Sequence, residues 1–168
     1  LAAILAADVV GYSKMMGQDE AGTLAAVRSI RAEVIDPKVA EHQGRLFKTM
    51  GDGFLVEFPS VVNAVACAAA IQTTMAARNA DQPDDRRLQL RIGVHLGDVI
   101  SEGGDVYGDG VNVAARIEGL APAGGVAMSA MVHDNVGSRL DLAFEDMGEQ
   151  QLKNIAKPLR VYRFAAST

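Results

Sequence analysis

The stretch Arg45–Phe58, RLFKTMGDGFLVEF, predicts a β-hairpin near the middle of the chain. Strand-forming residues stand on both sides of a Gly-Asp-Gly turn at 51–53. In the second half of the stretch, Phe54, Val56 and Phe58 alternate with their neighbours, so they share one face of a strand. Any sheet that this chain forms therefore contains this antiparallel pair.

A helical segment is predicted on each side of the hairpin. Upstream, apolar residues at helical spacing indicate a helix from Asp19 to about His42, which Asp19 can cap and Pro37 kinks or splits. Downstream, Ser60 is placed to cap a helix that runs to about Arg78. Both helices connect the hairpin to further strands.

A further strand precedes the upstream helix, and another follows the downstream helix. Residues 2–10 are a short apolar run, interrupted by Asp8, that is typical of a buried strand. Residues 88–100 alternate between apolar and other side chains, so one face is predicted to join the core. The other face is predicted to be polar and sterically open, because Gly93 and Gly97 carry no side chain.

The last third of the chain adds elements to this core. The expected elements are a helix over 109–120, a strand over 126–129, a short helix over 130–140, and strands over 142–148 and 159–164. The order β-α-β-β-α-β, followed by additional C-terminal strands and a helix, predicts an α+β fold with a ferredoxin-like core. Since no internal repeat or linker is visible, residues 1–168 are predicted to be a single domain.

Composition limits the class of protein further. The chain has 168 residues, with 21 Asp and Glu against 16 Lys and Arg, a balance that argues against a nucleic-acid polymer as partner. The composition does not exclude a small anionic ligand, because a few local cationic side chains can bind it. No apolar run is long enough to cross a bilayer, and Cys67, the lone cysteine, lies in an apolar run typical of a packed thiol.

The start of the chain gives a separate indication. It begins with Leu-Ala-Ala-Ile, without an initiator Met, a basic region or a cleavage site. We therefore expect a fragment of a longer protein and a cytoplasmic location, although the parent chain could be membrane-anchored.

Asp8 and Asp52 are the first candidates for chemistry. A lone carboxylate in an apolar strand, such as Asp8, is costly unless it is paired or bound to a cation. In a ferredoxin-like sheet the first strand can neighbour the hairpin, so the two carboxylates can meet and hold Mg²⁺ together with substrate phosphates. The alternatives are an ordinary Asp-Gly turn for Asp52, and a helix cap or salt bridge for Asp8.

Asn112 and Arg116 are the second candidates. They stand four residues apart, so they project from one face of the predicted helix, and this pair suits a sugar hydroxyl and a phosphate. A solvated polar face is the equally weighted alternative.

Lys48 is a third candidate, predicted to share a strand face with Leu46 and Met50. It can contact a base edge or a carboxylate, and an ordinary edge-strand lysine is the alternative. Asp105 and Lys153 are uninformative when taken alone.

Five segments together carry a family resemblance. They are AADVVGYS (6–13), FKTMGDGF (47–54), RIGVHLGD (91–98), DVYGDGVNVAARIE (105–118) and LKNIAKPLRVY (152–162). In this order, and spread through nearly the whole chain, they resemble the class III nucleotidyl cyclase catalytic domain. The resemblance raises the metal-binding and helix-face interpretations above their alternatives.

The resemblance implies a role for each candidate, and the first roles concern the metals and the base. Asp8 and Asp52 match the two metal-binding aspartates, and the carbonyl of Val9 would also face a metal, for two Mg²⁺ or Mn²⁺ per active site. Lys48 and Asp105 match the purine-selecting pair, and this combination favours adenine.

Further roles implied by the resemblance concern the rest of the nucleotide. Asn112 looks like the ribose-orienting residue, Arg116 like the transition-state arginine, and Lys153 like the triphosphate-binding lysine. The implied reaction is the conversion of ATP to 3′,5′-cyclic AMP and pyrophosphate. A guanylate cyclase, a non-catalytic nucleotide-sensing domain and a dinucleotide-making cyclase are the alternatives.

The family resemblance also implies a homodimer with active sites shared between two chains. The face around Gly93–Gly97 and the segment Asp105–Arg116 would then lie near the interface. The arm Val99–Gly104 is shorter than in many members of the family, so a weaker dimer or a requirement for neighbouring domains is expected. Regulatory domains are accordingly expected in the parent chain.

Overall fold

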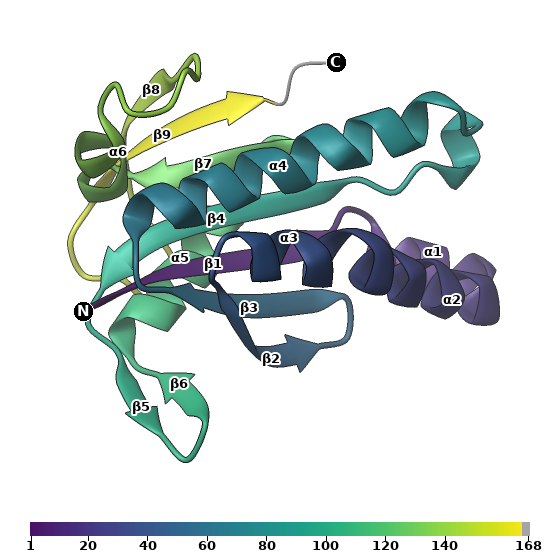
Figure 1. The fold of residues 1–168 in the computed structure, drawn as a ribbon, viewed down its shortest axis with the longest axis horizontal. Helices are drawn as coiled ribbons and strands as arrows, with labels where there is room; N and C mark the ends of the chain where they lie inside the picture. Colours follow the sequence, from purple (N-terminus) through teal and green to yellow (C-terminus); the bar gives the residue numbers. More distant parts are fainter. Residues whose placement is uncertain (166–168) are drawn as a thin grey trace.

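A seven-stranded sheet forms the frame of the computed structural model, which describes residues 1–165. Helices cover both faces of this sheet (Figure 1). The strands are β1 (Ala2–Val9), β2 (Arg45–Met50), β3 (Gly53–Phe58), β4 (Leu90–Gly97), β7 (Gly125–Ser129), β8 (Glu145–Gln150) and β9 (Leu159–Ala165). Their order across the sheet is β2-β3-β1-β4-β7-β9-β8.

The sheet order confirms the predicted ferredoxin-like core. β1 lies between β3 and β4 and is antiparallel to both, and β2 pairs with β3 at the edge. The additional strands continue beyond β4, with β7 parallel to it and β9 and β8 antiparallel. A parallel neighbour requires a crossover, and the helix between β4 and β7 supplies it.

The helices differ in detail from the predicted ones. They are α1 (Tyr12–Gln18), α2 (Glu20–Ile30), α3 (Asp36–Glu41), α4 (Val61–Ala80), α5 (Asp109–Glu118) and α6 (Ala130–Val136), with a π-helical turn η1 (Arg31–Ile35) and a 3₁₀ turn η2 (Asp84–Arg86). The expected caps are present: Asp19 accepts the N–H of Gly22, and Ser60 accepts that of Asn63. Pro37 falls in the first turn of α3, directly after η1, so the segment stays helical and the effect of Pro37 is an irregular π-helical turn rather than a split into two helices.

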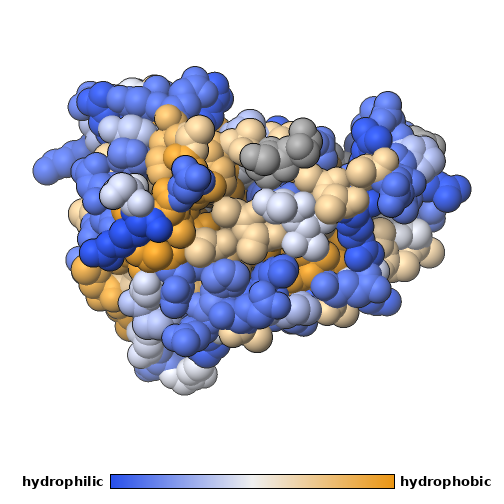
Figure 2. All heavy atoms as spheres, turned by 45° about the horizontal axis from the view of Figure 1, so that its top comes forward, coloured by the Kyte–Doolittle hydropathy of each residue, from blue (hydrophilic) through white to orange (hydrophobic). Residues whose placement is uncertain are grey.

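The larger hydrophobic core lies between the sheet and the helices α2, α3, α4 and α6. Leu5 of β1, Val56 of β3 and Ile71 of α4 are fully buried in it. Cys67 is buried among them, and burial raises the pKa of its thiol to about 12, which confirms the packed thiol. Figure 2 shows small apolar residues across the middle of the face that carries α4, with hydrophilic residues at both ends.

The opposite face of the sheet is covered by α5. Ile4 and Ala6 of β1 pack there with Leu55 of β3 and with Val111 and Ala114 of α5. β1 is therefore apolar on both sides, and this explains why its sequence is a continuous apolar run rather than an alternating one.

The prediction that the sheet face around Gly93 and Gly97 is sterically open was wrong. α5 lies directly on it: a Cβ atom at Gly93 would be 2.4 Å from the backbone nitrogen of Glu118, and one at Gly97 would be 3.0 Å from the Cα of Gly110. The glycines thus serve the close approach of this chain's own helix to the sheet.

A second correction concerns Lys48, which does not share a face with Leu46. The β2–β3 pairing shifts by one residue between them, so Leu46 is opposite Val56 whereas Lys48 is opposite Leu55. Directly paired residues point to the same side of a sheet, and the bulge therefore turns Lys48 to the α5 side.

The segment after β4 also differs from the prediction. The strand ends at Gly97 instead of 100, and the segment between it and α5 forms an unpredicted hairpin of β5 (Ile100–Glu102) and β6 (Asp105–Tyr107), a two-stranded sheet of its own. Figure 1 shows this hairpin projecting below the main sheet. In residues 1–165 no helix has the length and hydropathy that a membrane span requires.

Candidate active site

The strand pairing brings Asp8 and Asp52 to one corner of the sheet. Asp8 is the last residue but one of β1, and Asp52 stands in the turn between β2 and β3. Because Ala7 is paired with Phe54, the end of β1 meets this turn. The backbone N–H of Val9 donates to Oδ2 of Asp52 at 2.9 Å, which fixes the turn against the strand end.

The electrostatics of this corner fit a cation. Burial raises the pKa of Asp52, and the negative charge of Asp8 raises it further, whereas the hydrogen bond from Val9 opposes the rise. A divalent cation would relieve the repulsion between the two carboxylates, and Mg²⁺ is typically held by one or two carboxylates together with phosphate oxygens. Within residues 1–165, no group of three or more His, Cys, Asp or Glu side chains is arranged to hold a metal.

Glu118 is a third acid at this corner, and the sequence analysis missed it. It ends α5, is only 8% exposed, and its carboxyl is in hydrogen-bond contact with that of Asp8. Burial raises its pKa to about 9, with the contact and charge of Asp8 adding to the rise and Arg91 opposing it. One signal was available: Glu118 continues the buried stripe of Val111 and Ala114 at helical spacing.

A hollow connects the acids to the outer surface of α5. Its volume is about 250 Å³, and Asp8, Asp52 and Glu118 line it together with Met50 and Ala115. Ala115 is next to Arg116 in α5, so the hollow borders the outward face of that helix. A phosphate-bearing ligand that enters it would reach the carboxylates directly.

Lys48 and Asp105 are exposed on two strands that lie beside each other, β2 and β6. Arg45, at the start of β2, holds these strands together. Its Nη1 donates to the carbonyl of Gly104 at 2.9 Å, and its Nε pairs with Glu57 at 2.5 Å. The Asp105 carboxylate accepts the N–H of Val106 at 2.8 Å, which restrains its orientation.

Asn112, Arg116 and Lys153 are exposed. Asn112 and Arg116 share the outward face of α5, as predicted, while Lys153 stands in the loop between β8 and β9. Within residues 1–165, none of these three side chains makes a hydrogen bond or an ion pair. The structure therefore brings Asp8, Val9 and Asp52 together at one corner and places the other candidate side chains at the surface. The individual roles of all these residues stay predictions.

Comparison with known proteins places these features in a family. The family model "Adenylate and Guanylate cyclase catalytic domain" matches residues 2–165. The curated relative "Putative adenylate cyclase 3" of Rhizobium meliloti is 54% identical over 165 residues, which is 98% of this chain and 28% of the relative. An "Adenylate cyclase" of Streptomyces coelicolor is 34% identical over 120 residues, covering 69% of this chain and 29% of the relative. The chain thus spans less than a third of either relative.

Solved structures agree with the sequence comparison. The "Adenylate/Guanylate Cyclase/Hydrolase" from Silicibacter pomeroyi superposes with a TM-score of 0.93 at 42% identity, covering 99% of this chain and 96% of that one. The adenylyl cyclase CyaB from P. aeruginosa superposes with a TM-score of 0.82 at 20% identity, covering 99% and 94% of the two chains, and shows a shared fold. The resemblance carried by the five sequence segments is thereby confirmed.

Proposed function

Because this chain belongs to the family of adenylate and guanylate cyclase catalytic domains, we propose that it is an adenylate cyclase. It would convert ATP into 3′,5′-cyclic AMP and pyrophosphate. The observation that carries the proposal is the pair of carboxylates, Asp8 and Asp52, fixed at one corner of the sheet by the Val9–Asp52 hydrogen bond. This corner opens into a hollow beside α5.

The reaction needs an activated hydroxyl and a stabilised leaving group. The ribose 3′-oxygen forms a bond to the α-phosphorus, and the bond from that phosphorus to the bridging oxygen breaks, releasing pyrophosphate. The hydroxyl proton passes to water or to a phosphate oxygen of the substrate. Asp8, Asp52 and the carbonyl of Val9 would hold two Mg²⁺ or Mn²⁺. When bound, these ions lower the pKa of the attacking hydroxyl and neutralise triphosphate charge.

The exposed side chains would hold the nucleotide. Lys48 would donate to adenine N1 and Asp105 would accept from the adenine amino group, which selects ATP over GTP. Their positions on the adjacent strands β2 and β6, which Arg45 ties together, support a joint role. Asp105 has a further restraint, the hydrogen bond from Val106.

Phosphate and ribose would be held from α5 and from the β8–β9 loop. Asn112 would orient the ribose for in-line attack, and Arg116 would stabilise the charge that grows on the α-phosphoryl oxygens. Lys153 would bind the triphosphate. Their outward positions leave these donors available to a substrate bound on the surface of the chain.

We propose further that the enzyme is a homodimer with shared sites. In each site one chain would supply Asp8 and Asp52, and its partner Lys48, Asp105, Asn112 and Arg116. The contrast between the half-buried carboxylates of Asp8 and Asp52 and the exposed side chains of the other set supports this division. A homodimer built in this way has two equivalent sites.

The reaction is tested by product analysis. The purified chain is incubated with ATP or GTP and with Mg²⁺ or Mn²⁺, over a range of protein concentrations. Cyclic AMP from ATP, with activity per chain rising with concentration, is the expected result. Formation of more cyclic GMP from GTP than cyclic AMP from ATP would favour a guanylate cyclase. No cyclic nucleotide with any combination of nucleotide and metal ion would contradict the proposal.

Shared sites are tested by mixing two inactive variants. Asp52→Ala chains and Arg116→Ala chains are each expected to keep about 1% of wild-type activity or less when alone. In an equal mixture about half of the dimers are mixed, and one of their two sites is intact, so about a quarter of wild-type activity should return. Mixed dimers without activity, verified with two different affinity tags, would refute the division of residues.

A further inference from the structure

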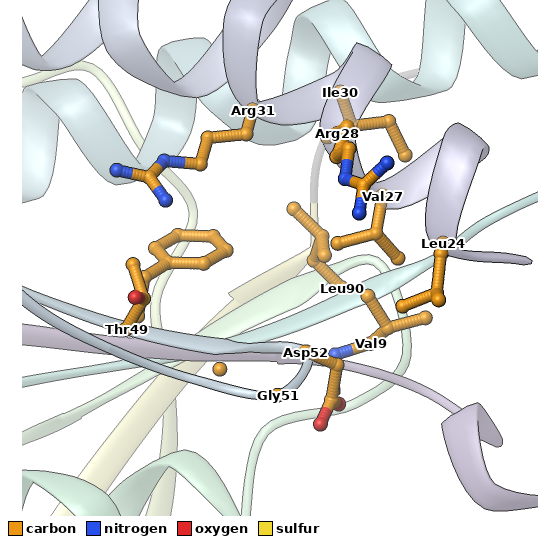
Figure 3. Close-up of a pocket in the computed structure, with 12 residues that line it drawn as sticks. Val9, Leu24, Val27, Arg28, Ile30, Arg31, Thr49, Gly51, Asp52 and Leu90 are labelled. Carbon is orange, nitrogen blue, oxygen red and sulfur yellow. Dashed lines mark hydrogen bonds between the residues drawn. The ribbon is translucent and has the colours of Figure 1, made fainter.

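A cavity lies behind the turn that carries Asp52, on the face of the sheet opposite α5. Its volume is about 210 Å³, and it separates α2 from the β2–β3 hairpin (Figure 3). The lining is mainly apolar: Val9, Leu24, Val27, Ile30, Phe54 and Leu90. Leu24 and Val27 are only partly buried, so the helix side of this space is incompletely filled.

Two arginines complete the wall of this cavity. Arg28 and Arg31 come from consecutive turns of the helical segment and are both exposed. Arg31 has one distant ion pair, with 3.8 Å between its Nε and Oδ1 of Asp36, and Arg28 has none among the residues that the structure describes. Thr49 adds a hydroxyl from β2.

The acid in the lining faces elsewhere. Figure 3 shows the carboxylate of Asp52 on the side of the turn away from Arg28 and Arg31. That carboxylate accepts the N–H of Val9, and it belongs to the candidate active site. The cavity itself therefore combines an apolar interior with positive charge at its rim.

We propose that this cavity binds a small organic anion with an apolar body, of the class of short-chain monocarboxylates. Apolar walls favour a hydrocarbon chain, and guanidinium groups bind carboxylates through charge-assisted hydrogen bonds. The volume is below the roughly 300–1,000 Å³ of sites for drug-sized ligands, and it equals about seven water volumes. A carboxylate with a chain of about six carbons matches this space.

Binding at this place would act on the turn that carries Asp52. Gly51 and Gly53 belong to the wall of the cavity, so an occupant contacts the backbone on both sides of Asp52. An occupant that braces this turn would regulate the metal-binding corner, and this consequence rests on the proposed function. Binding itself does not, and it can be measured without any turnover.

The probe is hexanoate, with two matched controls. Hexanamide has the same number of non-hydrogen atoms but no charge, and acetate has the charge without the chain. Titrations into ¹⁵N-labelled wild-type protein are followed by NMR, using the amide signals of Gly51, Gly53 and Val27. Hexanoate is expected to shift these signals with a dissociation constant on the order of 1 mM, and both controls to bind at least about fivefold more weakly.

Variants separate this cavity from nonspecific binding. Arg28→Gln and Arg31→Gln, both at exposed positions, are expected to weaken hexanoate binding about fivefold each, whereas Arg139→Gln, far along the chain and also exposed, leaves it unchanged. Val27→Phe fills the cavity and is expected to abolish binding. Circular dichroism checks its fold, and Leu24→Phe is the second filling variant.

Several outcomes would overturn the proposal. They are equal binding of hexanoate and hexanamide, unchanged affinity in both arginine variants, or binding that survives in a folded filling variant. A chain that binds hexanoate but makes no cyclic nucleotide refutes the proposed function and leaves the cavity site standing. A chain that is an active cyclase but does not bind hexanoate refutes the cavity site and leaves the proposed function standing.

Discussion

The two parts of the candidate active site differ in how the chain itself fixes them. The carboxylate corner, Asp8, Asp52 and Glu118, is joined by a strand pairing, a backbone hydrogen bond and a carboxyl–carboxyl contact. The exposed set, Lys48, Asp105, Asn112, Arg116 and Lys153, stands on the surface of three separate regions. The difference teaches that the fold of one chain already brings its acids together, whereas the side chains proposed to hold the nucleotide remain separate and exposed.

The largest expected effect comes from breaking the carboxylate corner at Asp52. Asp52→Asn keeps an acceptor for the Val9 N–H but removes the charge that would hold a cation. We expect the rate of cyclic AMP formation to fall about 1,000-fold, since metal assistance is worth several kcal/mol. Asp98→Asn, at an exposed acid outside the corner, is the matched control and should keep near-normal activity.

Arg116 tests the exposed set in the same way. Arg116→Ala is expected to lower kcat about 100-fold with little change in KM, because the side chain would act on charge that develops in the transition state. The melting temperature should stay within about 1 °C of wild type, since the exposed side chain of Arg116 makes no hydrogen bond or ion pair within residues 1–165. A large loss of stability would show that Arg116 is held by packing within its own chain and is not a free surface group.

Glu118 gives a pH-dependent test of the corner. Its pKa is about 9 in the folded chain, against an ordinary value of 4.5, so the folded state binds this proton more strongly than the unfolded state. The stability that this difference provides is complete below pH 4.5 and is lost as pH rises towards 9. Glu118→Gln cannot ionise, so its melting temperature should gain roughly 5 °C relative to wild type between pH 6 and pH 8.

The comparison for Glu118 needs its own control. Glu149→Gln, at an exposed acid of β8, is the matched control for the loss of one carboxylate. A constant difference between wild type and Glu118→Gln over this pH range would contradict the raised pKa of Glu118.

The smallest effect is expected at Arg45, which ties the hairpin β5–β6 to β2. Arg45→Ala removes the hydrogen bond to Gly104 and the ion pair with Glu57. Exposed pairs contribute less than about 1 kcal/mol, so the melting temperature should fall by about 2 °C or less. We expect a roughly twofold rise in KM for ATP, since Lys48 and Asp105 lose their common support. Arg86→Ala, at an exposed position of η2, is the control.

The sequence alone was sufficient for the order of the ferredoxin-like core elements and for the meeting of Asp8 with Asp52, but not for α1 or for the hairpin β5–β6. Local signals carried these predictions: alternation in β3, the caps at Asp19 and Ser60, and the Gly-Asp-Gly turn. Each of these signals depends on near neighbours in the chain, and this is why a single sequence reveals them.

Other features depended on contacts between distant segments. Gly93 looks like an open position until α5 is placed on it, and Glu118 looks like a solvated helix end until that helix brings it to Asp8. The bulge before Lys48 arises from pairing between two strands, and the pattern of β2 alone does not contain it. Tertiary packing determined each of these outcomes.

The separate hairpin β5–β6 has a consequence for the time scales of this molecule. Two-stranded hairpins are marginally stable alone, whereas β1 and β4 are buried on both faces of a seven-stranded sheet. Amide hydrogens of the hairpin should therefore exchange through frequent local opening, and those of β1 and β4 through rare global unfolding. Asp105 belongs to the fast population and Asp8 to the slow one, so the residues proposed for base recognition and for metal binding are expected to open on different time scales within one chain.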